Sequence, residues 1–179
     1  MLRRLRLQFI TIASLAILFI LVFTVGIINT VRSFQTEQEI SKVLNTLTEN
    51  NGSFGKTKKI ETNQGHEIPL DSFRFFSVTL SGDKVVSQDT SHTSLIDDEE
   101  AVSYALAASR MTNTLGTIRE KNINLSYQVS KVSKNKILVV FLDTTSYYNS
   151  SQALLSLSIL LSMFGFIFFV VIVSADRKS

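Results

Sequence analysis

Few side chains in this sequence have the types and spacing that catalysis requires. The seven glycines are scattered, so they form no phosphate-binding loop. No G-x-S-x-G motif marks a nucleophilic serine, and no combination of acid, base and nucleophile stands out, which disfavours a hydrolase. The lack of cysteine excludes disulfides, thiolate zinc sites, a cysteine nucleophile and a lipoprotein cleavage site. The sequence therefore predicts no enzymatic activity, no catalytic residue, no cofactor and no metal for this chain.

Two groups of polar residues remain as candidates for a site. The acids from Asp97 to Glu100 could bind a divalent cation, but calcium loops alternate their ligands around a turn, whereas these acids are consecutive. An apolar helical pattern follows them, so we expect Asp97 to cap a helix with Glu100 at its third position. His92, three residues after Asp89, could titrate near neutral pH. A single loop histidine is more often a polar surface residue.

Aromatic residues form the other candidate group. On alternating strands opposite a helix such residues are mostly core, and the remaining possibility is a pocket for an apolar or aromatic ligand. The candidate pocket residues are Phe76, Tyr104 and Tyr127. The whole aromatic set is Phe73, Phe75, Phe76, Tyr104, Tyr127 and Phe141.

Two long apolar runs must position these residues. Ala153 to Val173 has 21 residues without a charge, and Phe9 to Ile28 is a second such run. At about 1.5 Å per residue, each covers the ~30 Å core of a bilayer, so both are expected to be transmembrane helices. The first is too long for the apolar region of a signal peptide, which favours an uncleaved anchor. In the second, a face of small residues is a candidate for helix packing: Ser158, Ser162 and Gly165.

Charge predicts the orientation of these spans. The tails, residues 1–8 and 174–179, hold five basic residues and one acid, whereas residues 29–152 hold 13 basic and 14 acidic residues. Basic residues stay on the cytoplasmic side, so both termini are expected in the cytoplasm and residues 29–152 outside, in a multi-pass protein of the cell membrane. The basic pI near 9.2 is thus a signal of topology, and nucleic-acid binding is not expected.

The outer segment predicts an α+β domain. A helix should continue from the first span to Asn50, and a polar loop, 53–72, in which one short strand could form, should follow. A hairpin is expected over 73–89 with its turn at 81–83, then a helix from Asp97 to about Asn113 ended by Leu115-Gly116. Strands over 123–129 and 137–142 complete an antiparallel sheet with helices packed on it, a PAS-like architecture. Ten residues, 143–152, should connect the last strand to the second span.

Three segments in this order resemble a known family. They are RFFSVTLSGDKVVSQDTSH (74–92), DDEEAVSYA (97–105) and ILVVFLDTTS (137–146). Together they resemble the N-terminal extracytoplasmic sensor region of sensor histidine kinases from Gram-positive bacterial two-component systems. The resemblance implies a homodimer and a kinase core after the second span, through which a response regulator would be reached. The chain stops at Ser179, and its two histidines, His66 and His92, match no phospho-acceptor motif, so the resemblance assigns no kinase activity to this chain.

The leading hypothesis is therefore a sensor-input module. A stimulus outside the cell would change the sheet domain, and the second span would pass a small shift across the bilayer. The expected partners are the lipid bilayer, a second copy of the chain and an extracellular ligand or stimulus whose chemistry the sequence leaves open. The alternative is a free-standing protein with two spans that binds and regulates another membrane protein.

Overall fold

The computed structural model describes residues 2–53, 55, 59–61, 65, 67–69, 72–120 and 122–175. The chain divides into two compact units. One is the sheet domain, Gln35–Tyr148, and the other is the helical unit, which consists of Met1–Phe34 and Asn149–Ser179.

The helical unit holds most of the two long helices, α1 (Leu2–Glu49) and α3 (Thr145–Ala175). Both are long and apolar enough to cross a membrane, by length and composition. Large apolar side chains project from them without protein cover, since Phe9 is 74% and Leu161 is 70% exposed. Exposing such side chains to water is costly, whereas lipid tails would cover them. The prediction of two apolar helices at the two ends of an α+β domain is confirmed.

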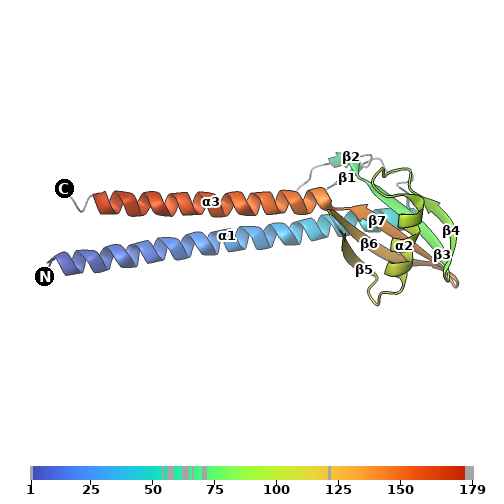
Figure 1. Ribbon diagram of the computed structural model, residues 1–179, viewed down its shortest axis with the longest axis horizontal. Helices are drawn as coiled ribbons and strands as arrows, with labels where there is room; N and C mark the ends of the chain where they lie inside the picture. Colours follow the sequence, from blue (N-terminus) through green and yellow to red (C-terminus); the bar gives the residue numbers. More distant parts are fainter. Residues whose placement is uncertain are drawn as a thin grey trace. The chain divides into compact units, whose positions relative to one another are not determined.

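The sheet domain is built on five antiparallel strands in the order β4-β3-β7-β6-β5 (Figure 1). The prediction of a buried central strand is confirmed, because β7 lies in the middle of the sheet and its residues 138–142 are buried. The predicted hairpin is also confirmed as β3 and β4. The strands are β3 (Phe75–Ser81), β4 (Lys84–Asp89), β5 (Leu115–Glu120), β6 (Ile123–Ser133) and β7 (Lys136–Asp143).

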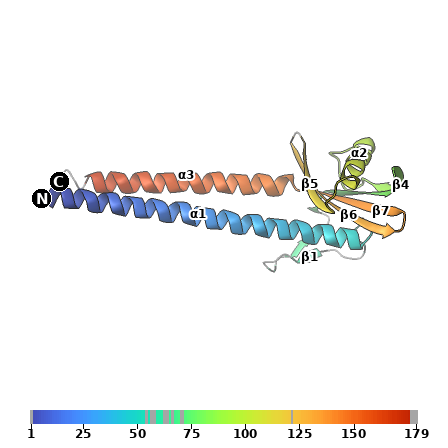
Figure 2. The same cartoon turned by 90° about the horizontal axis from the view of Figure 1, so that it is seen from below.

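A helix covers each face of this sheet. Figure 2 shows α2 (Asp98–Ser109) on one side and the end of α1, residues 35–49, on the other. Strand residues alternate between two cores, so Val139 and Phe141 of β7 pack toward α2 while Val140 packs toward α1. The apolar stripe of α1 is buried in the core between this helix and the sheet: Ile40, Val43, Leu44 and Leu47.

Local hydrogen bonds explain where α1 ends and where α2 begins. The predicted stop of α1 is confirmed, because Asn51 (φ 56°) and Gly52 (φ 83°) turn left-handed and the Gly52 N–H donates to the Leu47 carbonyl at 2.8 Å. The predicted cap of α2 is also confirmed, since the Asp97 carboxylate accepts the Glu100 N–H at 2.8 Å.

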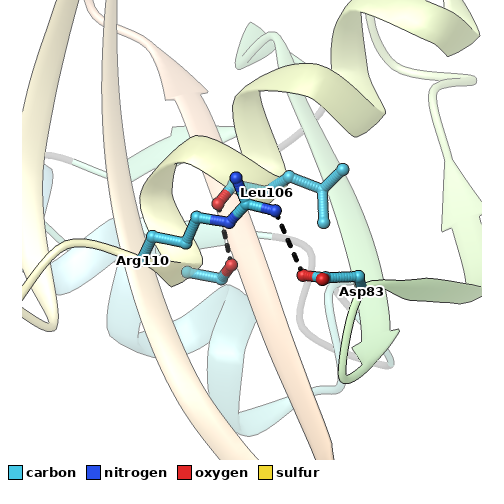
Figure 3. A network of polar contacts seen from close by, with 4 residues as sticks. Asp83, Leu106 and Arg110 are labelled. Carbon is cyan, nitrogen blue, oxygen red and sulfur yellow. Dashed lines mark hydrogen bonds and ion pairs between the residues drawn. The ribbon is translucent and has the colours of Figure 1, made fainter.

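Just after its C-terminal end, α2 is connected to the turn of the β3–β4 hairpin. Figure 3 shows Arg110, just after the helix, reaching toward Asp83 in the turn between β3 and β4. The guanidinium lies 3.3 Å from the carboxylate, and both side chains are exposed. An exposed ion pair contributes at most about 1 kcal/mol, so this contact adds little to the stability of the fold.

The structure corrects the sequence predictions for the end of α2 and for the loop 53–72. The helix α2 ends at Ser109 and not near Asn113, and Leu115-Gly116 begins the edge strand β5. The composition of β5 does not favour a strand, and its pairing with β6 supplies the backbone hydrogen bonds that hold it in the sheet. The loop 53–72 contains two short strands, β1 (Lys59–Glu61) and β2 (Glu67–Pro69), which pair with each other. The predicted loop residues Lys56, Lys58 and His66 lie outside the described residues.

Candidate functional site

The junction between β7 and α3 is the place where the sheet passes directly into an apolar helix. The strand ends at Asp143 and the helix begins at Thr145, so Thr144 alone connects them. The predicted ten-residue connection is therefore wrong, because residues 145–152 are helical. Tyrosine and serine have only moderately unfavourable helix propensities, so residues 145–152 can form the start of the helix once the Asp143 carboxylate caps it.

Hydrogen bonds to β6 anchor this junction. Thr144 is fully buried, and both its N–H (2.8 Å) and its hydroxyl (3.0 Å) donate to the Asn124 carbonyl. In return, the Asn124 N–H donates to the Thr145 hydroxyl at 2.9 Å. The Asp143 carboxylate accepts the Thr145 N–H at 2.9 Å, which satisfies one of the free donors at the helix start. Any displacement of the first turn of α3 must therefore break or carry along the start of β6.

A chain of hydroxyl groups continues from the junction across the sheet. The Thr144 oxygen lies 3.1 Å from the Ser126 oxygen in β6, which lies 3.2 Å from the Thr117 oxygen in β5. Ser126 is buried, whereas Thr117 is exposed. The chain thus connects the residue before α3 with the edge strand of the sheet.

Two tyrosines fix the first turn of α3 from different sides. Tyr147 packs against the core that contains the apolar stripe of α1. The ring of Tyr148 lies under the guanidinium of Arg119 in β5, at 5.1 Å from the ring centre. A cation over an aromatic face at this distance contributes about 0.5–1 kcal/mol at an exposed site.

A cavity of about 160 Å³ lies beside these groups and entirely within the sheet domain. It is bounded by α1, β5, β6 and the first turn of α3. Its walls combine aliphatic side chains, hydroxyl groups and one carboxylate. The lining residues are Glu37, Ile40, Ser41, Leu44, Leu115, Gly116, Thr117, Ser126 and Tyr148.

The residues predicted for a pocket lie on the opposite face of the sheet, in the core under α2. Phe76 stacks on Phe141 at 4.6 Å, and the rings of Tyr127 (5.8 Å) and Tyr104 (6.4 Å) also surround Phe141. Phe76 and Tyr127 are buried, so the interpretation of these two as core residues is confirmed. Burial, and then a 3.0 Å hydrogen bond to the Glu120 carboxylate, raise the pKa of Tyr104. Their role in binding a ligand stays a prediction.

The remaining polar candidates have local structural partners. The ring of His92 stacks on Phe75 at 4.4 Å. Asp89 accepts the hydroxyl (2.6 Å) and the N–H (3.0 Å) of Ser91, and the hydroxyl chiefly holds the pKa of Asp89 below its usual value. Among the described residues, no group of three or more His, Asp or Glu side chains could hold a metal ion.

The small residues of α3 lie in the helical unit. Ser158 and Ser162 are half-buried, and the Ser158 hydroxyl donates to the Leu154 carbonyl of its own helix at 2.8 Å. Gly165 is exposed, with open space where a side chain would begin. Their role in packing against another helix stays a prediction.

Sequence reasoning missed the residues of the junction. Thr117, Asn124, Ser126 and Thr144 are ordinary polar residues of strands and strand ends, and nothing in their spacing marks them. They meet only because β5, β6 and β7 pair in register, which places Ser126 opposite both Thr117 and Leu142. No model of a protein family matches this chain, and no curated protein matches it either.

Proposed function

We propose that this chain is the membrane-anchored input module of a sensor histidine kinase. In this proposal residues 29–152 lie outside the cell, both termini lie in the cytoplasm, and the module acts as a homodimer. The sheet domain is a PAS-like sensor domain whose structure changes with an outer stimulus. The helix α3 carries that change across the bilayer. The resemblance of three segments to such sensor regions and the excess of basic residues in the tails support this proposal.

The single observation that carries the proposal is the one-residue connection between β7 and α3. A long flexible linker would absorb a small movement of the strand, whereas a helix that begins directly after the strand must follow it. The hydrogen bonds between Thr144, Thr145 and Asn124 add a second attachment, to β6. A shift in the centre of the sheet would therefore reach the first turn of α3.

A glycine insertion tests this connection. The chain is joined through α3 to a histidine kinase core, and four glycines are inserted between Tyr148 and Asn149, beyond all the contacts that attach the first turn of α3 to β6 and β7. The matched control carries the same insertion between Gly82 and Asp83, in the turn between β3 and β4. Ser126→Ala, which alters the domain beside the junction, serves as the stimulus, and autophosphorylation of the core is measured.

We expect Ser126→Ala to change autophosphorylation in the control and to have no effect when the glycines follow Tyr148. An equal response in both proteins would refute transmission through this junction. The intact mass of the gene product isolated from its native membrane separates the two hypotheses for the whole protein. A product larger than 20.0 kDa by a kinase core supports the sensor, and a product near 20.0 kDa supports a regulator of another membrane protein.

A further inference from the structure

The cavity beside the junction has the size and composition of a site for a small amphipathic molecule. Its volume of about 160 Å³ is close to that of an engineered, enclosed cavity of about 150 Å³ that holds benzene. Here, however, exposed lining residues such as Leu115 and Thr117 leave the cavity open to solvent on one side. One part of the wall is aliphatic, formed by Ile40, Leu44 and Leu115. The other part presents oxygen atoms. An occupant would therefore have a short apolar body and a polar group at one end.

The direction of the hydroxyl chain determines what Thr117 can offer to that polar group. The Thr144 hydroxyl has one proton, which it donates to the Asn124 carbonyl. The Ser126 hydroxyl must then donate to Thr144, and the Thr117 hydroxyl must donate to Ser126. Thr117, which lines the cavity, has thus committed its only side-chain proton, and its oxygen can act toward a ligand only as an acceptor.

The charge of the cavity lining also favours a ligand group that donates hydrogen bonds. Glu37 is exposed on α1 and is the only residue of the cavity lining that carries a formal charge at neutral pH. A carboxylate and a hydroxyl oxygen restricted to accepting both select a hydrogen-bond donor, and the carboxylate selects a positive one. An anionic ligand would be repelled by Glu37 and would find no proton on Thr117. It would have to be held instead by the hydroxyls of Ser41 and Tyr148 or by Arg119, whose guanidinium lies 5.1 Å from the Tyr148 ring centre.

We propose that this cavity binds a small organic ammonium compound, with about eight to ten non-hydrogen atoms, whose amino group donates to Thr117 and Glu37. Chains of hydrogen bonds polarise one another, so a cation at Thr117 strengthens the bonds through Ser126 to Thr144. Binding would thereby tighten the attachment of α3 to the sheet. This effect on α3 rests on the proposed function, whereas the binding itself does not.

Three probes of nearly equal shape test the polarity of the site: benzylamine, benzyl alcohol and benzoate. The purified chain in lipid nanodiscs is titrated with each at pH 7, and binding is followed by NMR of isotope-labelled Thr and Leu methyl groups. We expect benzylammonium to bind at least about tenfold more tightly than benzyl alcohol, because a bond to a charged group is stronger than a neutral one. Benzoate is expected to bind more weakly than the alcohol.

Substitutions assign the binding to this cavity. Glu37→Gln should weaken benzylammonium about tenfold and leave benzyl alcohol unchanged, and Thr117→Val, which keeps the shape, should weaken the ammonium by a similar factor. The matched controls are Glu49→Gln at the end of α1 and Thr79→Val in β3, which should leave both affinities unchanged. Because Glu37 is exposed, Glu37→Gln should leave the domain folded. It therefore tests the site even if Thr117→Val unfolds the domain.

Equal affinities for benzylammonium and benzyl alcohol, or a preference for ammonium that survives Glu37→Gln, would overturn the assignment. Binding is measured without a kinase core, so its failure is separate from failure of the glycine-insertion test. Binding of the amine with no change in the methyl signals of Thr144 and Thr145 would confirm the site and reject its coupling to α3.

Discussion

Gly52 shows how one residue joins the end of α1 to the sheet. Its φ of +83° is a left-handed conformation, which L-residues other than glycine adopt at a cost. A β-carbon added there would also lie 2.4 Å from the Ser77 hydroxyl oxygen in β3. The glycine is therefore required both by the turn and by the close approach of the helix end to the strand.

Gly52→Ala is expected to destabilise the sheet domain by about 2–4 kcal/mol, the sum of the left-handed conformation and the overlap with Ser77. Gly82→Ala is the matched control, because Gly82 also has a positive φ (62°) but has open space around the added carbon. It should cost only about 1–2 kcal/mol. Chemical denaturation of both variants measures the difference, and equal losses would show that the Ser77 contact is unimportant.

Asp89 provides a prediction about pH. The pKa of its carboxyl lies below the ordinary 3.8, chiefly because the Ser91 hydroxyl donates to it. A depressed pKa contributes stability above the unfolded-state value, and this contribution is lost as the pH falls through the folded-state value. Ser91→Ala should raise the pKa of Asp89 and reduce the loss of stability in acid.

The pKa of Asp89 is measured by NMR titration of its side-chain carbonyl carbon, with Ser94→Ala as the control. Ser94 is exposed and is not a partner of Asp89 among the described contacts. An unchanged pKa in Ser91→Ala would mean that another group holds the carboxylate.

At the scale of elements, the attachment of α3 to β6 decides how the domain ends. Helices of this length are stable in lipid by their own backbone bonds, but where such a helix begins is set by its N-terminal partners. Here the partners are the Asp143 carboxylate and the backbone of Asn124. The helix therefore begins at the sheet, and not where the apolar run begins at Ala153.

Thr144→Val keeps the shape of the side chain and removes its hydroxyl. The buried Ser126 hydroxyl then loses its acceptor, which is expected to cost about 1–3 kcal/mol. Hydrogen exchange of the residue 145–148 amides should also become faster, because the start of α3 is less firmly held. Ser146→Ala, an exposed change in the same turn, should alter stability by less than about 0.5 kcal/mol. Unchanged exchange in Thr144→Val would exclude the hydroxyl as an anchor.

At the scale of the whole molecule, the two units need different solvents. The sheet domain buries its apolar residues in two cores, one on each face of the sheet. The helical unit instead exposes its largest apolar side chains, among them Phe9 and Leu161. Water suits the first arrangement and lipid the second, which is the physical basis for expecting a membrane anchor with a domain outside it.

The absence of cysteine makes the topology directly testable. A single cysteine is introduced at Gln88 in β4, at Leu2 or at Ser179, and intact cells are treated with a maleimide that cannot cross membranes. Gln88→Cys should be labelled in intact cells, and the other two only after the membrane is opened. The unchanged chain is the control and should not react. Labelling of Ser179→Cys in intact cells would contradict a cytoplasmic C-terminus.

The sequence by itself predicted the elements whose signal is local. Long apolar runs gave the two membrane-type helices, alternation gave β3 and β4, an unbroken apolar run gave β7, and Asp97 gave the start of α2. Each of these signals lies within a few residues of the element it predicts, because caps, turns and periodicity act over that range.

Only the tertiary structure decided the features that depend on strand pairing. The edge strand β5 forms because β6 offers it backbone partners, and the aromatic residues Phe76 and Tyr127 become core because α2 closes over them. Thr117, Ser126 and Thr144 are separated by up to 27 positions in the sequence. Their hydroxyl chain, and the cavity beside it, exist because the register of three strands brings them together, and no local pattern encodes that register.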